Sequence, residues 1–204
     1  MVSSRRELVR RTNVPDRPAA RPMKVVITGP FSAGKTTLIK TISEVAIVGT
    51  EREVSDESRS VKARTTVAMD FGRITFAQDL ALFLFGTPGQ RRFEVMWEIL
   101  SDGMIGFILL VNAADDRSLE EAAHIHEQFR RYADVPYVVG VTHLDENPES
   151  HDEVFSRVRQ VLELPSEVLV VACDPRDRGD VKRLMLEILM GVLRRLEQAV
   201  DEPA

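Results

Sequence analysis

The amino-acid sequence predicts a three-layer α/β fold, in which a six-stranded, mostly parallel sheet is covered by helices on both faces. Along most of the chain, short apolar segments rich in β-branched residues alternate with segments of helical periodicity. This alternation is typical of parallel strands joined by helical crossovers. Residues 65–76 and 80–85 differ, because only three residues separate these two strand-like segments. They predict a hairpin that adds one antiparallel strand at an edge of the sheet.

The individual elements follow from the apolar pattern. The expected strands comprise residues 24–28, 65–76, 80–85, 106–111, 137–141 and 168–172, and the expected helices comprise residues 37–42, 91–100, 118–133, 151–162 and 180–198. Ser118 is the expected N-cap of the third helix, with Glu121 completing a capping box. His124 and His126 in that helix are two residues apart and so not on one face, and we expect both at the surface or its boundary. In the last helix, apolar residues at helical spacing form a wide stripe that is expected to face the core.

The composition indicates one domain over residues 23–198, with an arm before it (residues 1–22) and a short tail after it (residues 199–204). The net charge of −5 argues against nucleic acid as the main partner. The single cysteine, Cys173, fits a reducing compartment. The longest apolar run, residues 104–111, is far shorter than a membrane-spanning helix. We therefore expect a cytoplasmic protein.

The arm contains six arginines and three prolines but few apolar residues. This composition predicts disorder, because such a segment has little apolar surface to bury. The arm either has no specific role or makes an electrostatic contact with anionic lipid or with an acidic partner. In the second case the protein is expected at the membrane periphery.

Residues 29–36 carry the clearest chemical signal, because two glycines with four residues between them are followed by Lys and Thr, as in a phosphate loop. The motif joins an expected strand to an expected helix, and backbone N–H groups at such a helix start suit a di- or triphosphate. The residues expected to contact the phosphates are Gly29, Phe31, Ser32, Ala33, Gly34, Lys35, Thr36 and Thr37. Lys35 is expected to reach the β- and γ-phosphates, and Thr36 to offer its hydroxyl to Mg²⁺.

Four further segments make the chain resemble the small Ras-like GTPases. These segments are residues 65–71, 86–90, 142–145 and 172–174. Within that superfamily, residues 23–198 look most like the bacterial conservon-type GTP-binding proteins, which are related to the gliding-polarity GTPases and work with a Roadblock/LC7 protein. The resemblance implies a P-loop NTPase fold, binding of GTP or GDP with Mg²⁺, and effector proteins that contact two switch loops.

The resemblance assigns the first of these loops to the γ-phosphate. Thr66 matches the switch I threonine that binds Mg²⁺ and senses the γ-phosphate, with Thr65 as the alternative register. Arg64 is the leading candidate for a catalytic arginine supplied in cis. Arg91 and Arg92 are weaker candidates, and each of these three arginines can instead face solvent or a partner.

The second loop departs from the family pattern. Gly86 stands where switch II normally begins with an Asp that helps to hold Mg²⁺, and this puts Mg²⁺ affinity and basal turnover in question. Gly89 matches the residue whose N–H meets the γ-phosphate. Gln90 matches the residue that orients the attacking water, so it is the expected catalytic glutamine.

The last two loops are expected to hold the base. Asp145 matches the carboxylate that accepts hydrogen bonds from guanine N1–H and the exocyclic amine, a donor pair that adenine lacks. Thr142 and His143 replace the usual Asn and Lys; the threonine can still brace the phosphate loop, and the histidine either stacks on the base or has no role. Ala172 and Cys173 occupy the loop that contacts guanine O6 through a backbone N–H.

Three functions are compatible with these motifs. The leading hypothesis is a GTP-dependent molecular switch with slow hydrolysis and partner-binding loops. The second is a nucleotide-bound scaffold that does not turn over, which the glycine at position 86 makes plausible. The third, a small-molecule phosphotransferase, requires a lid and an acceptor site with a general base, for which the sequence offers no candidate.

Overall fold

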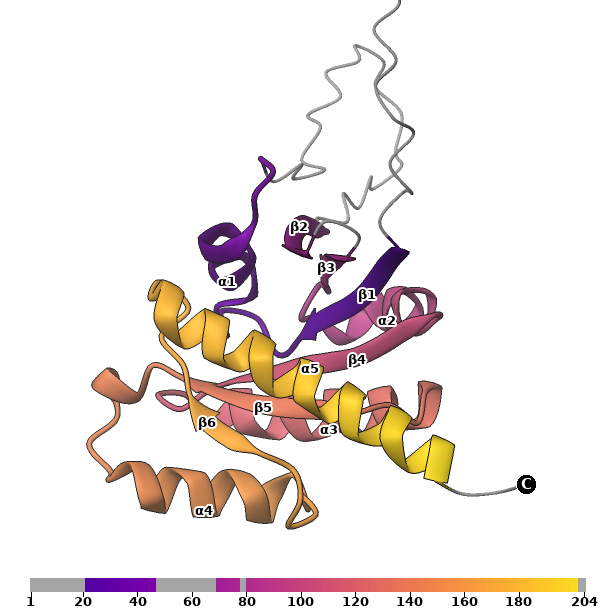
Figure 1. Ribbon diagram of the computed structural model, residues 1–204. Coiled ribbons are helices and arrows are strands. Elements are labelled where there is room, and N and C mark those ends of the chain that lie inside the picture. Colours follow the sequence, from indigo (N-terminus) through magenta and orange to yellow (C-terminus); the bar gives the residue numbers. More distant parts are fainter. Residues whose placement is uncertain (1–20, 47–68, 78–79, 202–204) are drawn as a thin grey trace, which may run out of the picture.

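The computed structural model describes residues 21–46, 69–77 and 80–201, and its centre is a six-stranded sheet in the order β2-β3-β1-β4-β5-β6 (Figure 1). The strands are β1 (Arg21–Thr28), β2 (Asp70–Ala77), β3 (Leu80–Gly86), β4 (Met104–Asn112), β5 (Tyr137–Thr142) and β6 (Val170–Ala172). Neighbouring strands are parallel except β2 and β3, which are antiparallel. The predicted fold class, including the antiparallel edge strand, is confirmed.

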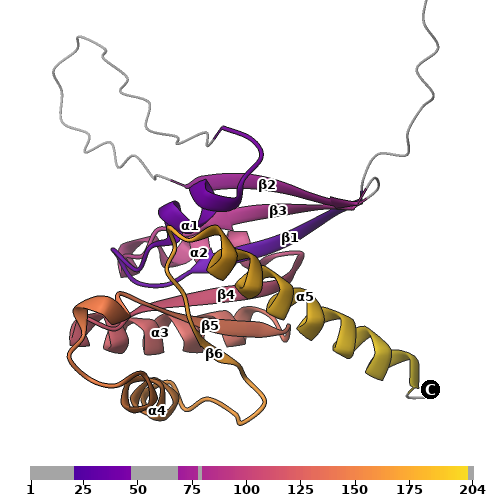
Figure 2. The ribbon, with the colours of Figure 1, turned by 60° about the vertical axis from the view of Figure 1, so that its left-hand side comes forward.

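The helices cover both faces of this sheet. They are α1 (Lys35–Ile42), α2 (Glu94–Ser101), α3 (Asp116–Tyr132), α4 (His151–Val161) and α5 (Arg178–Asp201), with short 3-10 helices η1 (Arg91–Phe93) and η2 (Leu144–Glu146). One core lies under α1 and α5 and includes Val25 and Ile27, while the other lies under α2, α3 and α4 and includes Val26 (Figure 2). Successive β1 side chains thus enter opposite cores, which explains why this strand is a continuous apolar run.

Several boundaries differ from those expected. Strand β1 begins at Arg21, inside the stretch expected to be arm, and α5 continues to Asp201, past residue 198. Strand β6 begins only at Val170, and the helix expected from residue 91 opens with a 3-10 turn. These shifts of a few residues leave the topology unchanged, as is usual for element ends. No helix in the described part of the chain is long and apolar enough to cross a bilayer.

The predicted cap of α3 is wrong. The helix begins at Asp116, and Asp115 is its N-cap, with the carboxylate accepting a hydrogen bond from the N–H of Arg117 at 3.0 Å. Ser118 lies inside the helix, is 2% exposed, and accepts from the N–H of Asn112 at 3.4 Å. Aspartate and serine are both favoured at an N-cap, and the chain reaches Asp115 first after β4.

The expected surface position of His126 is also wrong. His126 lies on α3 and is 5% exposed, with its ring 5.0 Å from that of Tyr137 on β5. Burial lowers the pKa of this imidazole to about 4, so it is neutral at physiological pH. His124 remains partly exposed and lies 3.5 Å from the Glu94 carboxylate.

Candidate functional site

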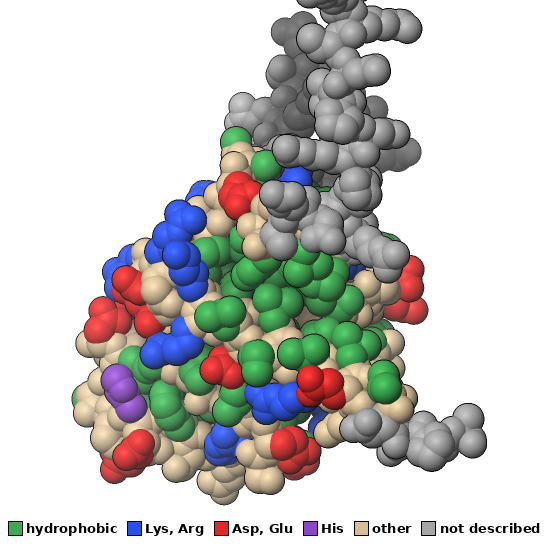
Figure 3. All heavy atoms as spheres, viewed as in Figure 1, with side chains coloured by type: hydrophobic (Ala, Val, Ile, Leu, Met, Phe, Trp, Pro, Cys, Tyr) green, Lys and Arg blue, Asp and Glu red, His purple; other side chains and the backbone are tan. Residues whose placement is uncertain are grey.

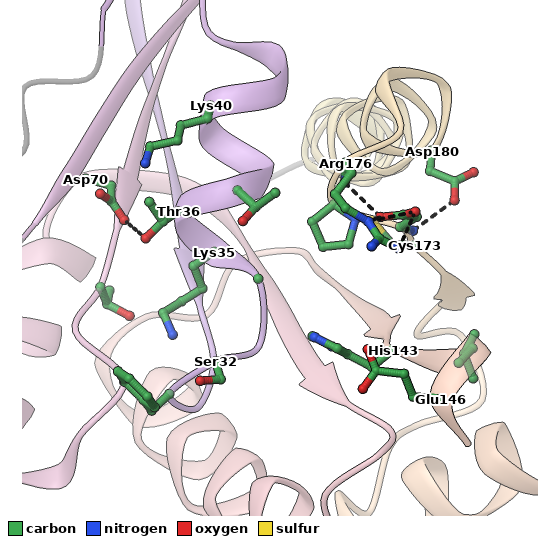
Figure 4. A pocket seen from close by; sticks show the side chains of 18 of the residues that line it. Ser32, Lys35, Thr36, Lys40, Asp70, His143, Glu146, Cys173, Arg176 and Asp180 are labelled. Carbon is green, nitrogen blue, oxygen red and sulfur yellow. Dashed lines mark hydrogen bonds and ion pairs between the residues drawn. The ribbon is translucent and has the colours of Figure 1, made fainter. Parts of the chain in front are cut away.

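A cavity of about 1050 Å³ opens at the carboxyl ends of the parallel strands, and Figure 4 shows its lining. Most of the lining comes from the loops that follow β1, β3, β5 and β6, and the rest includes Asp70 at the start of β2 and residues of α1, α4 and α5. Ligands of open α/β sheets bind at this edge. The fold therefore brings the phosphate loop, the 86–90 loop, the 142–145 segment and the 172–174 segment around one space.

The loop between β1 and α1 depends on its two glycines. A Cβ atom on Gly29 would lie 2.3 Å from the carbonyl oxygen of Leu110, so any side chain there collides with the β4 backbone. Gly34 precedes α1 with a φ of 94°, in the left-handed region that L-residues rarely adopt. The backbone is thus free to turn sharply and present the start of α1 to the cavity, where its N–H groups suit an anion.

Lys35 is the buried cation of this loop. The residue is 9% exposed, and Nζ donates hydrogen bonds to the carbonyl oxygens of Gly29 at 2.8 Å and Pro30 at 2.5 Å. Burial lowers the pKa of the Lys35 ammonium to about 8, although Asp70 and Glu121 act in the opposite direction. An anion in the cavity would raise this pKa and favour the protonated form.

Thr36 is paired with a carboxylate that none of the sequence motifs assigns to the site. Its hydroxyl donates to Asp70 Oδ2 at 2.5 Å (Figure 4). Asp70 is the first residue of β2 and lines the cavity. A hydroxyl and a carboxylate are the hard oxygen ligands that Mg²⁺ prefers. The residues at this end of the cavity therefore fit the ion expected beside a nucleotide phosphate.

Asp70 lies opposite Gly86, the residue that replaces the usual acid. The antiparallel register pairs Asp70 on β2 with Gly86 on β3. A Cβ atom on Gly86 would lie 3.0 Å from the Asp70 Cβ and 3.3 Å from Asp70 Oδ2. The Asp70 side chain thus fills the space next to position 86. The hairpin offered a signal for this relationship, since its short connection restricts the register and places residue 70 near residue 86.

The 86–90 loop is tied to the phosphate loop and to α2. A Cβ atom on Gly89 would lie 2.5 Å from the backbone nitrogen of Phe31, so glycine is required for this approach. Gln90 is exposed and lines the cavity. On the other side of the loop, the buried Trp97 indole of α2 donates from Nε1 to the carbonyl oxygen of Pro88 at 2.7 Å. A movement of this loop must therefore disturb Trp97.

The end of β5 and the residues after it lie on the side of the cavity opposite Lys35 (Figure 4). Thr142 is fully buried, and its hydroxyl contacts the carbonyl oxygens of Ala33 at 3.2 Å and Val111 at 3.1 Å, which links the phosphate loop to the sheet. His143 has a φ of 58°, and its Nδ1 lies 2.9 Å from the Thr142 hydroxyl. Asp145 lines the cavity with its side chain 68% exposed, 3.7 Å from Arg176.

The loop after β6 has two backbone N–H groups that are hydrogen-bonded within the protein. Ala172 and Cys173 both line the cavity. The N–H of Cys173 donates to the carbonyl oxygen of Val141 at 2.9 Å, and the N–H of Asp174 donates to Asp180 Oδ2 at 2.9 Å. Both groups are thus engaged within the protein. Burial raises the pKa of the Cys173 thiol to about 12, which keeps it protonated and a poor nucleophile.

The remaining expected residues are placed as follows. Phe31 and Ser32 are exposed at the cavity. Ala33 is the buried residue that follows them in the loop, and Thr37 is exposed on α1. Arg92 lines the cavity, with its guanidinium 4.8 Å from the ring centre of Phe93. Arg91 is exposed. Arg64, Thr65 and Thr66 lie outside the described residues.

Comparison with known proteins agrees with this geometry. The model of a family described as conserved hypothetical ATP binding protein matches residues 47–193, well over half of the chain. The chain belongs to this family. Together with the fold and the phosphate loop at residues 29–36, which precedes the matched segment, membership identifies a nucleotide-binding P-loop NTPase.

The chain is also similar to two individual proteins. The chain is 27% identical to the uncharacterized protein MJ1339 of Methanocaldococcus jannaschii over 135 residues, which covers 66% of this chain and 78% of that protein. It is 28% identical over 142 residues to translation initiation factor IF-2 of Malacoplasma penetrans. That match covers 69% of this chain but only 20% of the factor.

Proposed function

We propose that this P-loop NTPase is a GTP-binding molecular switch that hydrolyses GTP slowly. One observation carries the proposal: the lining of a single cavity contains Lys35 and Thr36 and also Asp145, which follows His143 on the far side of the cavity from Lys35. A cation and N–H groups bind phosphates, whereas a carboxylate requires a ligand that donates hydrogen bonds. A guanine nucleotide presents both kinds of group, in the form of GTP or GDP.

The base preference depends on Asp145. Guanine offers N1–H and an exocyclic amine to one carboxylate, while adenine has an acceptor at N1 and no amine at C2. A ligand that leaves this carboxylate without donors, or places an acceptor against it, is expected to bind more weakly by several kcal/mol. This is about the cost of leaving a charged group unsatisfied. The family description names ATP, so direct competition between guanine and adenine nucleotides tests this point.

Mg²⁺ fits the phosphate end of the cavity. Thr36 would bind the ion through its hydroxyl, Asp70 would support it with its carboxylate, and Thr66 would add a hydroxyl from the first switch loop. When bound, the ion neutralises charge on the phosphates and on the phosphoryl group in transfer. The Asp70 carboxylate thus takes over the role of the acid that is absent at position 86.

For hydrolysis, Gln90 would orient the attacking water beside the terminal phosphate, because it is exposed at the cavity and follows the close approach of Gly89 to the phosphate loop. Arg64 is the candidate for an arginine supplied in cis, and Arg92 at the cavity mouth is a second candidate. A glutamine without a fixed arginine supports only slow turnover, since the arginine is worth several orders of magnitude in related reactions.

Partners would recognise the state of the two switch loops. By resemblance to the conservon-type proteins, a Roadblock/LC7-type regulator and effector proteins are the proposed partners, in the cytoplasm. The arginines of the N-terminal arm would add a weak contact with anionic membrane.

Nucleotide content and single-turnover hydrolysis test the proposal together. Protein purified without added nucleotide is expected to release GDP or GTP when it is denatured, and reloading with GTP is expected to give slow phosphate release that Gln90→Leu abolishes without loss of binding. Bound guanine nucleotide with no phosphate release, alone or with a Roadblock protein, would favour the non-hydrolysing scaffold. Absence of guanine nucleotide affinity would reject the proposal.

A further inference from the structure

The loop between β6 and α5 holds Arg176 in a fixed position. The carbonyl oxygen of Pro175 accepts a hydrogen bond from Thr41 on α1 at 2.6 Å, which ties the loop to the first helix. Asp174 organises the turn itself, since its carboxylate accepts from the backbone N–H of Arg176 at 2.9 Å. The loop is therefore built before any ligand binds.

The guanidinium of Arg176 is also held in place. Its Nε donates to Asp174 Oδ1 at 2.9 Å, and its NH2 group donates to Asp174 Oδ2 at 3.0 Å, a fork that fixes the plane of the group (Figure 4). The same NH2 group lies 3.7 Å from Asp145 Oδ2. A guanidinium has five N–H donors, and the fork with one carboxylate leaves some of them for a ligand in the cavity, which Arg176 lines.

A guanine held by Asp145 needs one more donor at this place. Its O6 is bonded to the carbon next to N1, so a base whose N1–H points at Asp145 brings O6 to the neighbourhood of that carboxylate. The backbone N–H groups of Cys173 and Asp174 are already donated to Val141 and Asp180. Arg176, next to Asp145, has N–H groups to spare.

We propose that Arg176 donates a hydrogen bond to guanine O6 and so forms, with Asp145, a paired acceptor and donor that selects the base. This inference rests on the proposed guanine specificity and names the residue that completes it. Adenine would place an amine against Arg176 and an acceptor against Asp145, so both contacts would be lost. Arginine is well suited to the O6 edge of guanine, which it contacts in many nucleic-acid complexes.

The test measures binding of three diphosphates to the full chain by competition with a fluorescent GDP. GDP and inosine diphosphate both carry O6 and N1–H, whereas 6-thioguanosine diphosphate keeps N1–H and the exocyclic amine but has sulfur, a weak acceptor, at position 6. Arg176→Ala and Arg176→Met are compared with the wild type. Arg178→Ala, which removes an exposed arginine two residues away, is the matched control.

Both Arg176 variants are expected to bind GDP and inosine diphosphate about tenfold more weakly or worse, the cost of one charge-assisted hydrogen bond. Their affinity for the 6-thio analogue is expected to change less than about threefold, and Arg178→Ala is expected to match the wild type. An equal loss for all three diphosphates, or full affinity in Arg176→Met, would overturn the inference. If the wild type binds none of the three, the proposed guanine specificity fails instead.

Discussion

Asp70 on β2 and Gly86 on β3 face each other across the antiparallel strand pair, and a Cβ atom on Gly86 would come within 3.0 Å of the Asp70 Cβ. The carboxylate of Asp70 accepts a hydrogen bond from Thr36 on the phosphate loop. An acid on β2 therefore contacts Thr36 at the cavity, next to the position where the Ras-like pattern has its acid on β3. The absence of a side chain at position 86 leaves room for Asp70.

Variants that move the carboxylate from position 70 on β2 to position 86 on β3 test whether one acid can replace the other. Asp70→Ala is expected to weaken Mg²⁺-dependent nucleotide retention by about tenfold to a hundredfold, the range seen when an outer carboxylate of a metal site is removed. Gly86→Asp alone is expected to lower the free energy of unfolding by about 1–3 kcal/mol through overpacking and repulsion between two acids. The double variant is expected to regain most of the retention.

The readout is the dissociation rate of a fluorescent guanine nucleotide with Mg²⁺ and with excess chelator. Asp152→Ala, which removes an exposed acid on α4, is the control and is expected to leave this rate unchanged. If Asp70→Ala releases nucleotide at the wild-type rate in Mg²⁺, the assigned role of Asp70 is wrong.

The lowered pKa of Lys35 predicts that nucleotide affinity depends on pH. Its pKa of about 8 in the free protein lies below the ordinary value of 10.5 because the ammonium is buried. Bound phosphate raises this pKa, so above about pH 8 binding takes up a proton, and affinity is expected to fall by up to about tenfold per pH unit. Calorimetry in buffers of different ionisation enthalpy is expected to show proton uptake approaching one at pH 9 and near zero at pH 7.

The same shift has a consequence for folding. Between about pH 8 and 10.5 the folded protein loses the Lys35 proton while the unfolded chain still holds it. The cost of burying the ammonium is therefore relieved, and the free energy of unfolding rises with pH through that window. Lys35→Met is expected to remove both this trend and the proton uptake, and Lys182→Met, at an exposed site on α5, is expected to keep them. Affinity independent of pH up to pH 10 would contradict the assignment of Lys35 to the phosphates.

Trp97 is expected to report movement of the 86–90 loop. It is the only tryptophan in the chain, it is fully buried, and its indole N–H is bonded to the Pro88 carbonyl. Exchange of GDP for a non-hydrolysable GTP analogue is expected to change its emission, because under the proposed switch the loop contacts the terminal phosphate in one state only. Trp97→Phe is expected to lose the signal and about 1 kcal/mol of stability, measured by chemical denaturation. Identical spectra in the two nucleotide states would argue against a switch at this loop.

The sheet was predictable because each of its inner strands is a continuous apolar run, and the phosphate loop because its glycines, lysine and threonine are neighbours in sequence. The role of Asp70 was not predicted, since it depends on a hydrogen bond with Thr36, which lies far away in the chain. The short hairpin connection indicates that residues 70 and 86 lie close together, but it does not show that Asp70 also contacts Thr36.

Two smaller errors have different physical causes. Asp115 and Ser118 are both residue types favoured at an N-cap, so propensity alone does not show which of them begins the helix. His126 shares the buried face of α3 with Ala122 and Phe129, four residues before it and three after it, so helical spacing places it in the core. Its separation from His124, on which the surface expectation was based, gives no information about burial. Arg176 lies two residues beyond the 172–174 segment, so the motif does not indicate it.

The central claim is that Asp145 selects guanine, and nucleotide competition tests it most directly. Wild-type protein is expected to prefer GDP over ADP by at least about a hundredfold, since ADP loses two hydrogen bonds to a charged group. The Asp145→Asn variant is expected to bind GDP more weakly and xanthosine diphosphate more tightly than the wild type, because an amide can accept a hydrogen bond from N1–H and donate one to the carbonyl at C2. Equal affinity of the wild type for GDP and ADP, with no gain of xanthosine diphosphate in the variant, would contradict the account.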